Sequence, residues 1–306
     1  MEFNHKPVLY DEVIESLQIK PDGIYCDGTV GGAGHSKGIA EKLNGGMLYA
    51  FDRDPDALSV AKERLANLPA RVIKSNFCDM DKKLAEIGVT GVDGILLDLG
   101  VSSYQLDTAE RGFSYHKDAP LDMRMSKEGV SAADIIANYD VKSLTDIFST
   151  YGEEKFAYRI SCKIVEYRKT NPITTTLQLA DIISNSVPAA ARRNGHPARK
   201  CFQALRIAVN GELDSLADAL VRCFDILNTN GILSIITFHS LEDRMVKKKF
   251  RELCTGCTCP PDFPICVCGN KPKGHLLYKK PITASEEELK ENPRSRSATL
   301  RVIVKN

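Results

Sequence analysis

Three acidic residues stand where each could meet a bound ligand. Asp27 ends a short apolar run and precedes a turn of small residues, Gly28 to Gly34. Asp52 and Asp98 end two further apolar runs. Carboxylates attract positive charge and accept hydrogen bonds from hydroxyl and amino groups. The three residues therefore suit a ligand that combines a cationic group with polar hydrogens.

The small-residue turn is typical of the first βα unit of a doubly wound sheet, where glycines let a ligand touch the backbone. It does not fit the dinucleotide fingerprint GxGxxG, because a pattern started at Gly32 and Gly34 puts Lys37 at the third glycine. This disfavours a nucleotide-dependent dehydrogenase. Asp27 can instead meet an ammonium group, which favours S-adenosylmethionine. The alternative interpretation is a glycine-rich surface turn.

Two residues are candidates for the nucleoside part of such a ligand. Asp52 follows the glycine turn by some twenty residues, where an acidic residue accepts hydrogen bonds from ribose hydroxyls. Its alternative role is a helix cap, although Asp54 before Pro55 can supply that cap. Phe77 is placed to cover a flat base, and a core phenylalanine is the alternative.

The elements that must position these residues form an α/β pattern. The nearly continuous apolar run from Asp93 to Leu99 predicts a strand buried on both faces, which makes Asp98 costly unless it is functional or paired. Further strands are predicted at 24–27, 47–51, 71–73 and 232–238, with two more near Leu276 and at 300–304. Helices are predicted at 8–17, at 57–68, from Phe202 to Leu227 with a bend at Gly211, and at 241–253.

The segment between the fourth and fifth strands is far longer than a crossover needs. Its apolar residues recur at helical spacing, as in Phe156, Ile160 and Ile164. We therefore predict a helical domain at 106–210, inserted into a discontinuous core made of 1–105 and 211–306. Because the insertion leaves the sheet at the ligand-binding edge, we expect it to capture the substrate.

The charged residues are segregated along the chain, although the net charge is only +1. Between Ile182 and Gly211 there is no acidic residue, and the same holds between Phe263 and Ser285. The first stretch holds Arg192, Arg193, Arg199, Lys200 and Arg206, and the second holds Lys271, Lys273, Lys279 and Lys280. Such stretches suit a phosphate backbone. The alternative is a solvated face.

Ten cysteines in 306 residues indicate a reducing cytosol, since five of them crowd between Cys254 and Cys268. No apolar run is long enough to cross a membrane, and the N-terminus lacks a signal-peptide pattern. Two Cys-x-Cys pairs across a proline-rich turn could hold a structural zinc ion through Cys257, Cys259, Cys266 and Cys268, with Cys254 as a substitute ligand. A loop of reduced thiols is the alternative.

Many longer motifs are similar to those of one family, the bacterial 16S rRNA cytosine-N4 methyltransferases known as RsmH or MraW. The matching blocks run in order over almost the whole chain: 5–9, 27–29, 34–36, 98–103, 105–107, 111–114, 120–125, 151–154, 196–198, 202–207, 238–244 and 292–297. The resemblance implies a class I (Rossmann-like) methyltransferase sheet with an inserted helical domain. It also implies methyl transfer from S-adenosylmethionine to the exocyclic amine of a decoding-site cytidine, with 16S rRNA of the small ribosomal subunit as partner. For such an RNA substrate, we expect the aromatic residues Phe113 and Tyr115, which lie beside Arg111 and Arg124 in the insertion, to stack on an extruded base.

Carried over to this sequence, the resemblance puts the cofactor site at Ala33, Gly34, His35, Asp52, Phe77, Asp98 and Gln105. Three positions depart from the family pattern. Ala33 replaces a glycine and crowds the backbone, Arg199-Lys200 moves the guanidinium group, and Ser126 replaces an aspartate. The resemblance leaves both a monomer and a homodimer open.

The residues say little about a catalytic base. The Asn/Asp-Pro-Pro-aromatic device of many amino methyltransferases is replaced here by Asp98-Leu99-Gly100-Val101. Asp98 and His239 are the candidate proton acceptors, and His239 could equally be a structural histidine. Methylation at carbon 5 of cytosine usually needs a cysteine after proline, and no Pro-Cys dipeptide occurs. A binding module with an inactive sheet is the rival from another class, and the retained Asp27, Asp52 and Asp98 disfavour it.

Overall fold

The computed structural model describes residues 7–189, 192, 195–260, 265 and 267–306. The chain divides into two compact units. We call Met1–Gly100 with Leu213–Asn306 the sheet unit, and Val101–Glu212 the helical unit. The sequence analysis put the two junctions after residues 105 and 210.

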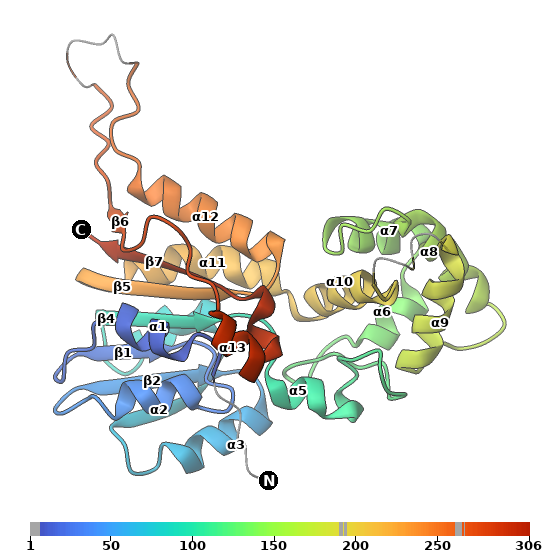
Figure 1. Cartoon of the computed structure of the whole chain (residues 1–306), viewed down its shortest axis with the longest axis horizontal. Helices are drawn as coiled ribbons and strands as arrows, with labels where there is room; N and C mark the ends of the chain where they lie inside the picture. Colours follow the sequence, from blue (N-terminus) through green and yellow to red (C-terminus); the bar gives the residue numbers. More distant parts are fainter. Residues whose placement is uncertain (1–6, 190–191, 193–194, 261–264, 266) are drawn as a thin grey trace. The chain divides into compact units, whose positions relative to one another are not determined.

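The sheet unit is built on a seven-stranded sheet with the order β3-β2-β1-β4-β5-β7-β6 (Figure 1). The strands β1 to β5 are parallel, while β7 is antiparallel to both β5 and β6. This confirms the predicted α/β class. The strands are β1 Ile24–Asp27, β2 Met47–Asp52, β3 Ala70–Lys74, β4 Val92–Asp98, β5 Leu227–Thr237, β6 Gly274–Leu276 and β7 Thr299–Lys305.

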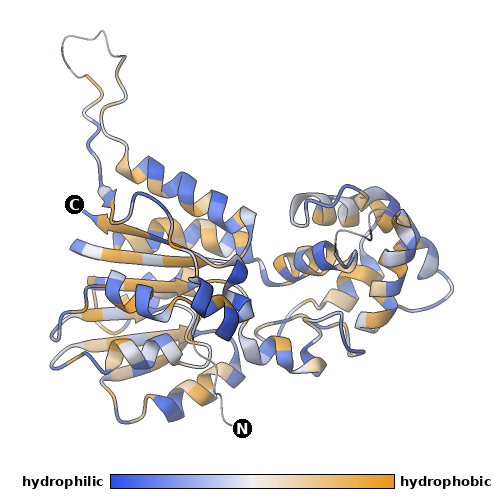
Figure 2. Cartoon of the chain, in the orientation of Figure 1, coloured by the Kyte–Doolittle hydropathy of each residue, from blue (hydrophilic) through white to orange (hydrophobic). Residues whose placement is uncertain are grey.

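Helices cover both faces of this sheet because its central strands are apolar on both sides. In β4, Leu96 packs with one helical layer, while Ile95 and Leu97 pack with the other. Apolar colour accordingly runs along the strands in Figure 2. One layer contains α1 Tyr10–Ser16, α2 Gly34–Ala40 and α3 Pro55–Arg64; the other contains α4 Met80–Ala85, α11 Glu212–Asp225 and α12 Ser240–Cys254. In the part of the chain that the structure describes, no helix is long and apolar enough to span a bilayer.

The helical unit has a hydrophobic core of its own. Ile160 and Ile164 are fully buried there, as the helical spacing predicted, and they pack with Leu144 and Phe148. Asn210 ties a loop to this core, because its side chain bonds the backbone of Met123 and Met125. The helices are α5 Ser103–Asp107, α6 Ala132–Asn138, α7 Val141–Thr150, α8 Ala157–Tyr167, α9 Thr176–Ser186 and α10 Ala198–Asn210, with the 3-10 turn η2 Ala109–Arg111.

The single long helix predicted from Phe202 to Leu227 is wrong. The chain forms two helices there, because α10 ends at Asn210 and α11 begins at Glu212. Gly211 between them has φ 57°, a left-handed conformation in which a helix cannot continue and which glycine adopts without steric cost. The glycine is therefore a helix end and not a bend.

Candidate cofactor site

Three aspartates meet at one edge of the sheet. Asp27, Asp52 and Asp98 are the last residues of β1, β2 and β4. These strands are parallel neighbours in the order β2-β1-β4, so their carboxyl ends lie at the same edge. Open α/β sheets bind ligands at that edge. The local sequence achieves this because each apolar run is long enough for one buried strand and stops at a carboxylate.

Asp27 organises the turn that follows it. Its side chain is 1% exposed. One carboxylate oxygen accepts the Thr29 backbone N–H at 3.0 Å, and the other accepts the Ser36 hydroxyl at 2.6 Å. Burial raises the pKa of Asp27 to about 6, and repulsion from Asp52 adds to this rise while the hydrogen bonds oppose it. Asp27 thereby joins the end of β1 to both ends of the small-residue turn.

Asp52 is held by the backbone on both of its oxygens. It accepts the N–H of Gly31 and that of Asp54, each at 2.9 Å. The cap of α3 comes from Asp54, which accepts the Asp56 N–H at 3.0 Å, so the predicted division of roles between Asp54 and Asp52 is confirmed on the capping side. Burial raises the pKa of Asp52. Each carboxylate oxygen has two lone pairs, so Asp52 can still accept ligand hydroxyls.

Asp98 carries a buried carboxylate oxygen, Oδ1, that has no hydrogen-bond partner among the described residues. Its other oxygen lies 3.7 Å from Nδ1 of His35. Burial raises the pKa of Asp98 well above its ordinary value, and repulsion from Asp27 and Glu242 raises it further. Buried polar atoms nearly always have partners. Oδ1 of Asp98 is therefore well suited to accept a hydrogen bond from a ligand or to face a positive charge.

His35 is neutral in this environment. It is 5% exposed, and burial lowers its pKa to about 4. Its Nε2 lies 3.0 Å from the Val8 carbonyl oxygen, which can only accept, so Nε2 carries the proton. Nδ1 is then an acceptor that faces Asp98. His35 also stacks on Tyr10, with ring centroids 6.0 Å apart.

The turn itself places Ala33 and Gly34 by close packing. Ala33 has φ 61°, a strained left-handed conformation for a residue with a side chain. Its methyl group is buried with Val30 and Ala50. Gly34 opens α2, and a Cβ there would lie 2.3 Å from Cγ of Pro7. The sequence predicted that the Ala33 methyl group would crowd the backbone. The structure shows that the strain at Ala33 instead comes from its left-handed backbone conformation.

Phe77 and Gln105 differ in what the structure says about them. Phe77 begins the 3-10 turn η1 Phe77–Asp79 and packs beside Gly28, where a Cβ would lie 2.9 Å from its own Cβ. It is partly buried, which agrees with either predicted role. Gln105 belongs to the helical unit, where its side chain accepts the Ser102 N–H at 3.0 Å in a capping box. Its predicted contact with the cofactor stays a prediction.

His239 has a structural role at the start of α12. Its Nδ1 accepts the Glu242 backbone N–H at 3.4 Å, and a Glu242 oxygen accepts the His239 backbone N–H at 3.3 Å. Nε2 of His239 lies 3.1 Å from the other Glu242 oxygen. This reciprocal capping box supports the structural alternative for His239 and leaves Asp98 as the stronger candidate base.

Sequence reasoning gave no role to Thr29 and Ser36, which fix Asp27. The Thr29 hydroxyl also accepts the Asp98 backbone N–H at 2.6 Å, so it links two of the three aspartates. The sequence signal that could have identified them is the presence of a small hydroxyl residue on each side of the glycine-rich turn.

The candidate RNA contacts of the helical unit need correction. Arg111, expected at the RNA site beside the aromatic residues Phe113 and Tyr115, is buried and donates to the carbonyls of Arg124 and Met125. Arg124 forms a bidentate ion pair with Asp122, and Phe113 is a core residue. These three side chains are thus held by the fold. Of the aromatic residues named there, Tyr115 alone lies outside the buried core.

Tyr115 stacks on the exposed ring of His196, with centroids 4.6 Å apart and planes at 19°. The exposed His116 packs against the same tyrosine at 4.5 Å. Arg192 and Arg199 of the basic stretch are exposed, and the charge of Arg199 acts on Tyr115. Lys200 donates to the Glu153 carbonyl, Arg206 pairs with Glu212, and Arg193 lies outside the described residues.

The predicted metal ligands are only partly described. The sulfur atoms of Cys257, Cys259 and Cys268 all lie within 4.8 Å of one another, whereas Cys266 lies outside the described residues. Cys254, the predicted substitute, is not part of this group. Hydrogen bonds from the backbone N–H groups of Val267 and Cys268 lower the pKa of Cys259.

The chain is similar to known proteins over almost its whole length. The family model described as the MraW methylase family matches residues 2–306. The chain is 53% identical over 308 residues to "Ribosomal RNA small subunit methyltransferase H" of Lachnospira eligens, covering 99% of this chain and 98% of the relative. It is also 53% identical over 310 residues to the protein of that name from Brevibacillus brevis, covering 100% and 99%. A crystal structure described as a putative rRNA-methylase from Clostridium thermocellum aligns over 97% of this chain and 95% of that chain, at 12% identity and a TM-score of 0.45.

Proposed function

The chain belongs to the MraW methylase family, and we propose that it transfers a methyl group from S-adenosylmethionine to the exocyclic N4 of a decoding-site cytidine in 16S rRNA. Its α/β sheet is the methyltransferase core that the resemblance implied. The names of the relatives support the small-subunit rRNA as substrate. A ribosomal substrate would place the protein in the cytoplasm.

The observation that carries this proposal is the set of three carboxylates that meet at the ends of β1, β2 and β4. Burial raises the pKa of Asp27, Asp52 and Asp98, and like-charge repulsion raises those of Asp27 and Asp98 further. A cation beside them would stabilise their ionised forms. S-adenosylmethionine carries two positive charges, a sulfonium and an ammonium group. Asp52 would accept the ribose hydroxyls, and Oδ1 of Asp98 would accept an N–H of the cofactor.

The chemistry asks mainly for positioning and for removal of a proton. When bound, S-adenosylmethionine supplies an electrophilic methyl group on a good leaving group. The N4 lone pair is delocalised into the cytosine ring, so N4, methyl carbon and sulfur must be held in line. Transfer of the methyl group would oblige N4 to give up one proton, which a side chain of the protein would accept. Asp98 is the candidate acceptor, because its carboxylate ends β4 at the edge of the sheet where the cofactor would bind.

We propose that RNA capture belongs to the helical unit. Its aromatic stack of Tyr115, His116 and His196 offers flat faces for unpaired bases, as single-stranded RNA sites do. The exposed Arg192 and Arg199 add positive charge for phosphates. This assignment keeps the predicted division between a cofactor-binding sheet and an RNA-binding insertion, and it replaces Arg111, Arg124 and Phe113 by the aromatic stack.

The test is methylation of small ribosomal subunits lacking this modification, with S-adenosylmethionine and purified protein. The rRNA is then digested to nucleosides and analysed by mass spectrometry. We expect N4-methylcytidine among the nucleosides. Formation of 5-methylcytidine would contradict the proposed target atom, and transfer to no nucleoside of any tested ribosomal particle, with cofactor binding intact, would contradict the rRNA substrate.

A further inference from the structure

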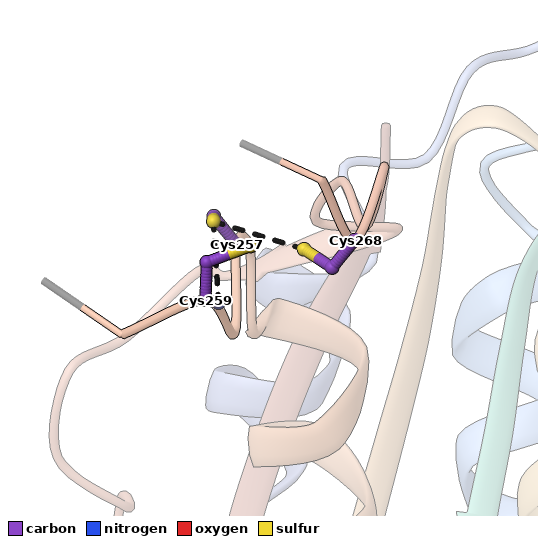
Figure 3. A group of neighbouring side chains, drawn as sticks. All are labelled: Cys257, Cys259 and Cys268. Carbon is purple, nitrogen blue, oxygen red and sulfur yellow. Dashed lines mark hydrogen bonds between the residues drawn. The ribbon is translucent and has the colours of Figure 1, made fainter. Parts of the chain in front are cut away.

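The segment between α12 and β6 brings three cysteine sulfurs together on a loop that leaves the sheet (Figures 1 and 3). Cys257 and Cys259 lie on its outgoing arm, and Cys268 lies on its returning arm. The sulfurs of Cys257 and Cys268 are 3.7 Å apart. A tetrahedral zinc ion with Zn–S bonds of about 2.3 Å separates its sulfur ligands by about 3.8 Å. The two arms therefore already hold their sulfurs at the spacing that such an ion requires.

Backbone N–H groups point at all three sulfurs. Cys257 and Cys268 each accept from the residue two positions later, Cys259 at 3.4 Å and Asn270 at 3.5 Å. Cys259 accepts from Val267 at 3.3 Å, and Cys268 accepts a second N–H from Thr258 at 3.4 Å. Hydrogen bonds from amides favour the thiolate, which is the form that binds a metal. The last two of these bonds cross between the arms, so each arm helps to position the sulfurs of the other.

The base of the loop is fixed independently of the sulfurs. The Asn270 side chain donates to the carbonyls of Thr255 and Gly256, at 3.1 and 2.7 Å. The Lys273 N–H donates to the Leu253 carbonyl at 2.8 Å. Beyond the sulfurs, by contrast, Ile265 is 76% exposed and Val267 is 74% exposed. Side chains that stay in water cannot hold a loop, and small substructures without a core are commonly held by disulfides or metals.

We propose that Cys257, Cys259 and Cys268 bind one zinc ion that fixes the outer part of this loop. Thiolate ligands select zinc over calcium and magnesium, which prefer oxygen. Each thiol exchanges its proton for a bond to the metal, so binding releases protons and involves no oxidation. These three residues leave one position of a tetrahedral site to another ligand. The proposal is independent of the methyltransferase reaction, since no part of it uses the cofactor site.

The first experiment measures metal content in the full-length protein. The protein is stripped with a chelator under reducing conditions, incubated with zinc, desalted and analysed by elemental mass spectrometry. We expect about one zinc per chain in the native protein and at least a fivefold loss in the double variant C257S/C268S. C162S, in the helical unit, and C254S, outside the sulfur group, are matched controls and should keep the metal.

A second measurement separates metal binding from folding. Zinc should protect Cys257, Cys259 and Cys268 from alkylation, while the circular dichroism spectrum of the double variant matches that of the controls. Less than about a tenth of a zinc per chain after reconstitution would overturn the proposal, as would full metal retention by the double variant. An iron–sulfur absorption spectrum would overturn it as well, as would a Cys257–Cys268 disulfide that persists under the reducing conditions of the reconstitution.

Discussion

Oδ1 of Asp98 has no hydrogen-bond partner among the residues that the structure describes, and the nearby imidazole of His35 is neutral, so this site suits a positively charged ligand. His35 cannot supply the charge, because burial lowers its pKa to about 4. Asp98 therefore experiences the negative charges of Asp27 and Glu242 without a compensating positive charge from His35. An ionised carboxylate that lies near other acidic side chains without a compensating positive charge lowers the stability of the fold. A bound cationic ligand would remove this destabilisation.

Cofactor affinity should depend on pH in a definite direction. The pKa of Asp27 is raised to about 6 and that of Asp98 is raised as well, and a bound cation lowers both. Binding then releases protons, so affinity for S-adenosylmethionine should increase as pH rises through about 6 and level off above the highest of these values. Titration calorimetry between pH 5 and pH 8, in buffers with different ionisation enthalpies, measures both the affinity and the released protons.

The control ligand in that titration is S-adenosylhomocysteine, which lacks the sulfonium charge and should show a weaker pH dependence. An affinity for S-adenosylmethionine that falls as pH rises would contradict the electrostatic assignment.

Asp52 and Asp54 provide a matched pair of substitutions. Asp52→Ala should weaken cofactor binding by about 2–4 kcal/mol, because the ribose hydroxyls lose a charged acceptor. Asp54→Ala should cost about 1 kcal/mol of folding stability through the lost cap of α3 and leave affinity nearly unchanged. Calorimetry with thermal unfolding distinguishes the two effects. Equal losses of affinity in both variants would mean that Asp52 acts only through the local backbone.

At the scale of elements, Gly211 separates α10 from α11. Gly211→Ala should destabilise the protein by about 1 kcal/mol, because the new side chain is forced into the left-handed region. Gly211→Asn is the control and should cost less, since asparagine tolerates that conformation. Urea unfolding of the three proteins measures the difference. If alanine proved neutral or stabilising, the two helices could merge and the end of α10 would not be set by this residue.

Features of the structure that depend on residues close together in the sequence were predicted best. β1, β2 and β4 were predicted with their terminal aspartates because a buried strand is a local apolar run. The capping box of His239 and Glu242 spans only four residues, but the sequence analysis did not identify it and left the role of His239 open. Local patterns therefore sufficed for the sheet edge that carries the candidate site.

Contacts between distant residues could not be read in the same way. From the sequence, Arg111 was expected to be a surface arginine beside aromatic residues. In the structure it is buried, and it donates to backbone carbonyls that lie more than ten residues later in the sequence. The loop that supplies them is held by Asn210, from another helix. Similarly, the stack of Tyr115 on His196 joins residues that no periodicity connects. Side-chain type alone did not separate a structural arginine from one that binds RNA.

At the scale of the whole molecule, binding of RNA and of cofactor should be separable. Arg192→Ala with Arg199→Ala should weaken binding of the rRNA substrate, and the slope of log affinity against log salt should flatten by about 0.7 for each phosphate that the variant no longer neutralises. Cofactor affinity should stay unchanged. Binding assays across a salt series, with calorimetry for the cofactor, test both statements.

The control for this pair is Lys163→Ala with Lys169→Ala, which removes the same charge from exposed positions of the helical unit. A loss as large as that of the arginine pair would assign the effect to net charge alone. If the variant that lacks Arg192 and Arg199 bound RNA as strongly as the wild type, the basic stretch would be only a solvated face, which is the alternative given in the sequence analysis.

The insertion of the helical unit between β4 and β5 has a consequence for the order of folding. β4 pairs with β5 along most of its length, yet the ribosome makes the entire helical unit before β5 emerges. The core of that unit is built from its own residues, mostly through short-range helix contacts that form quickly. The first four strands must therefore wait, with one side of β4 unpaired, while the helical unit folds. During synthesis, the part proposed to hold RNA would be complete before the part proposed to hold the cofactor.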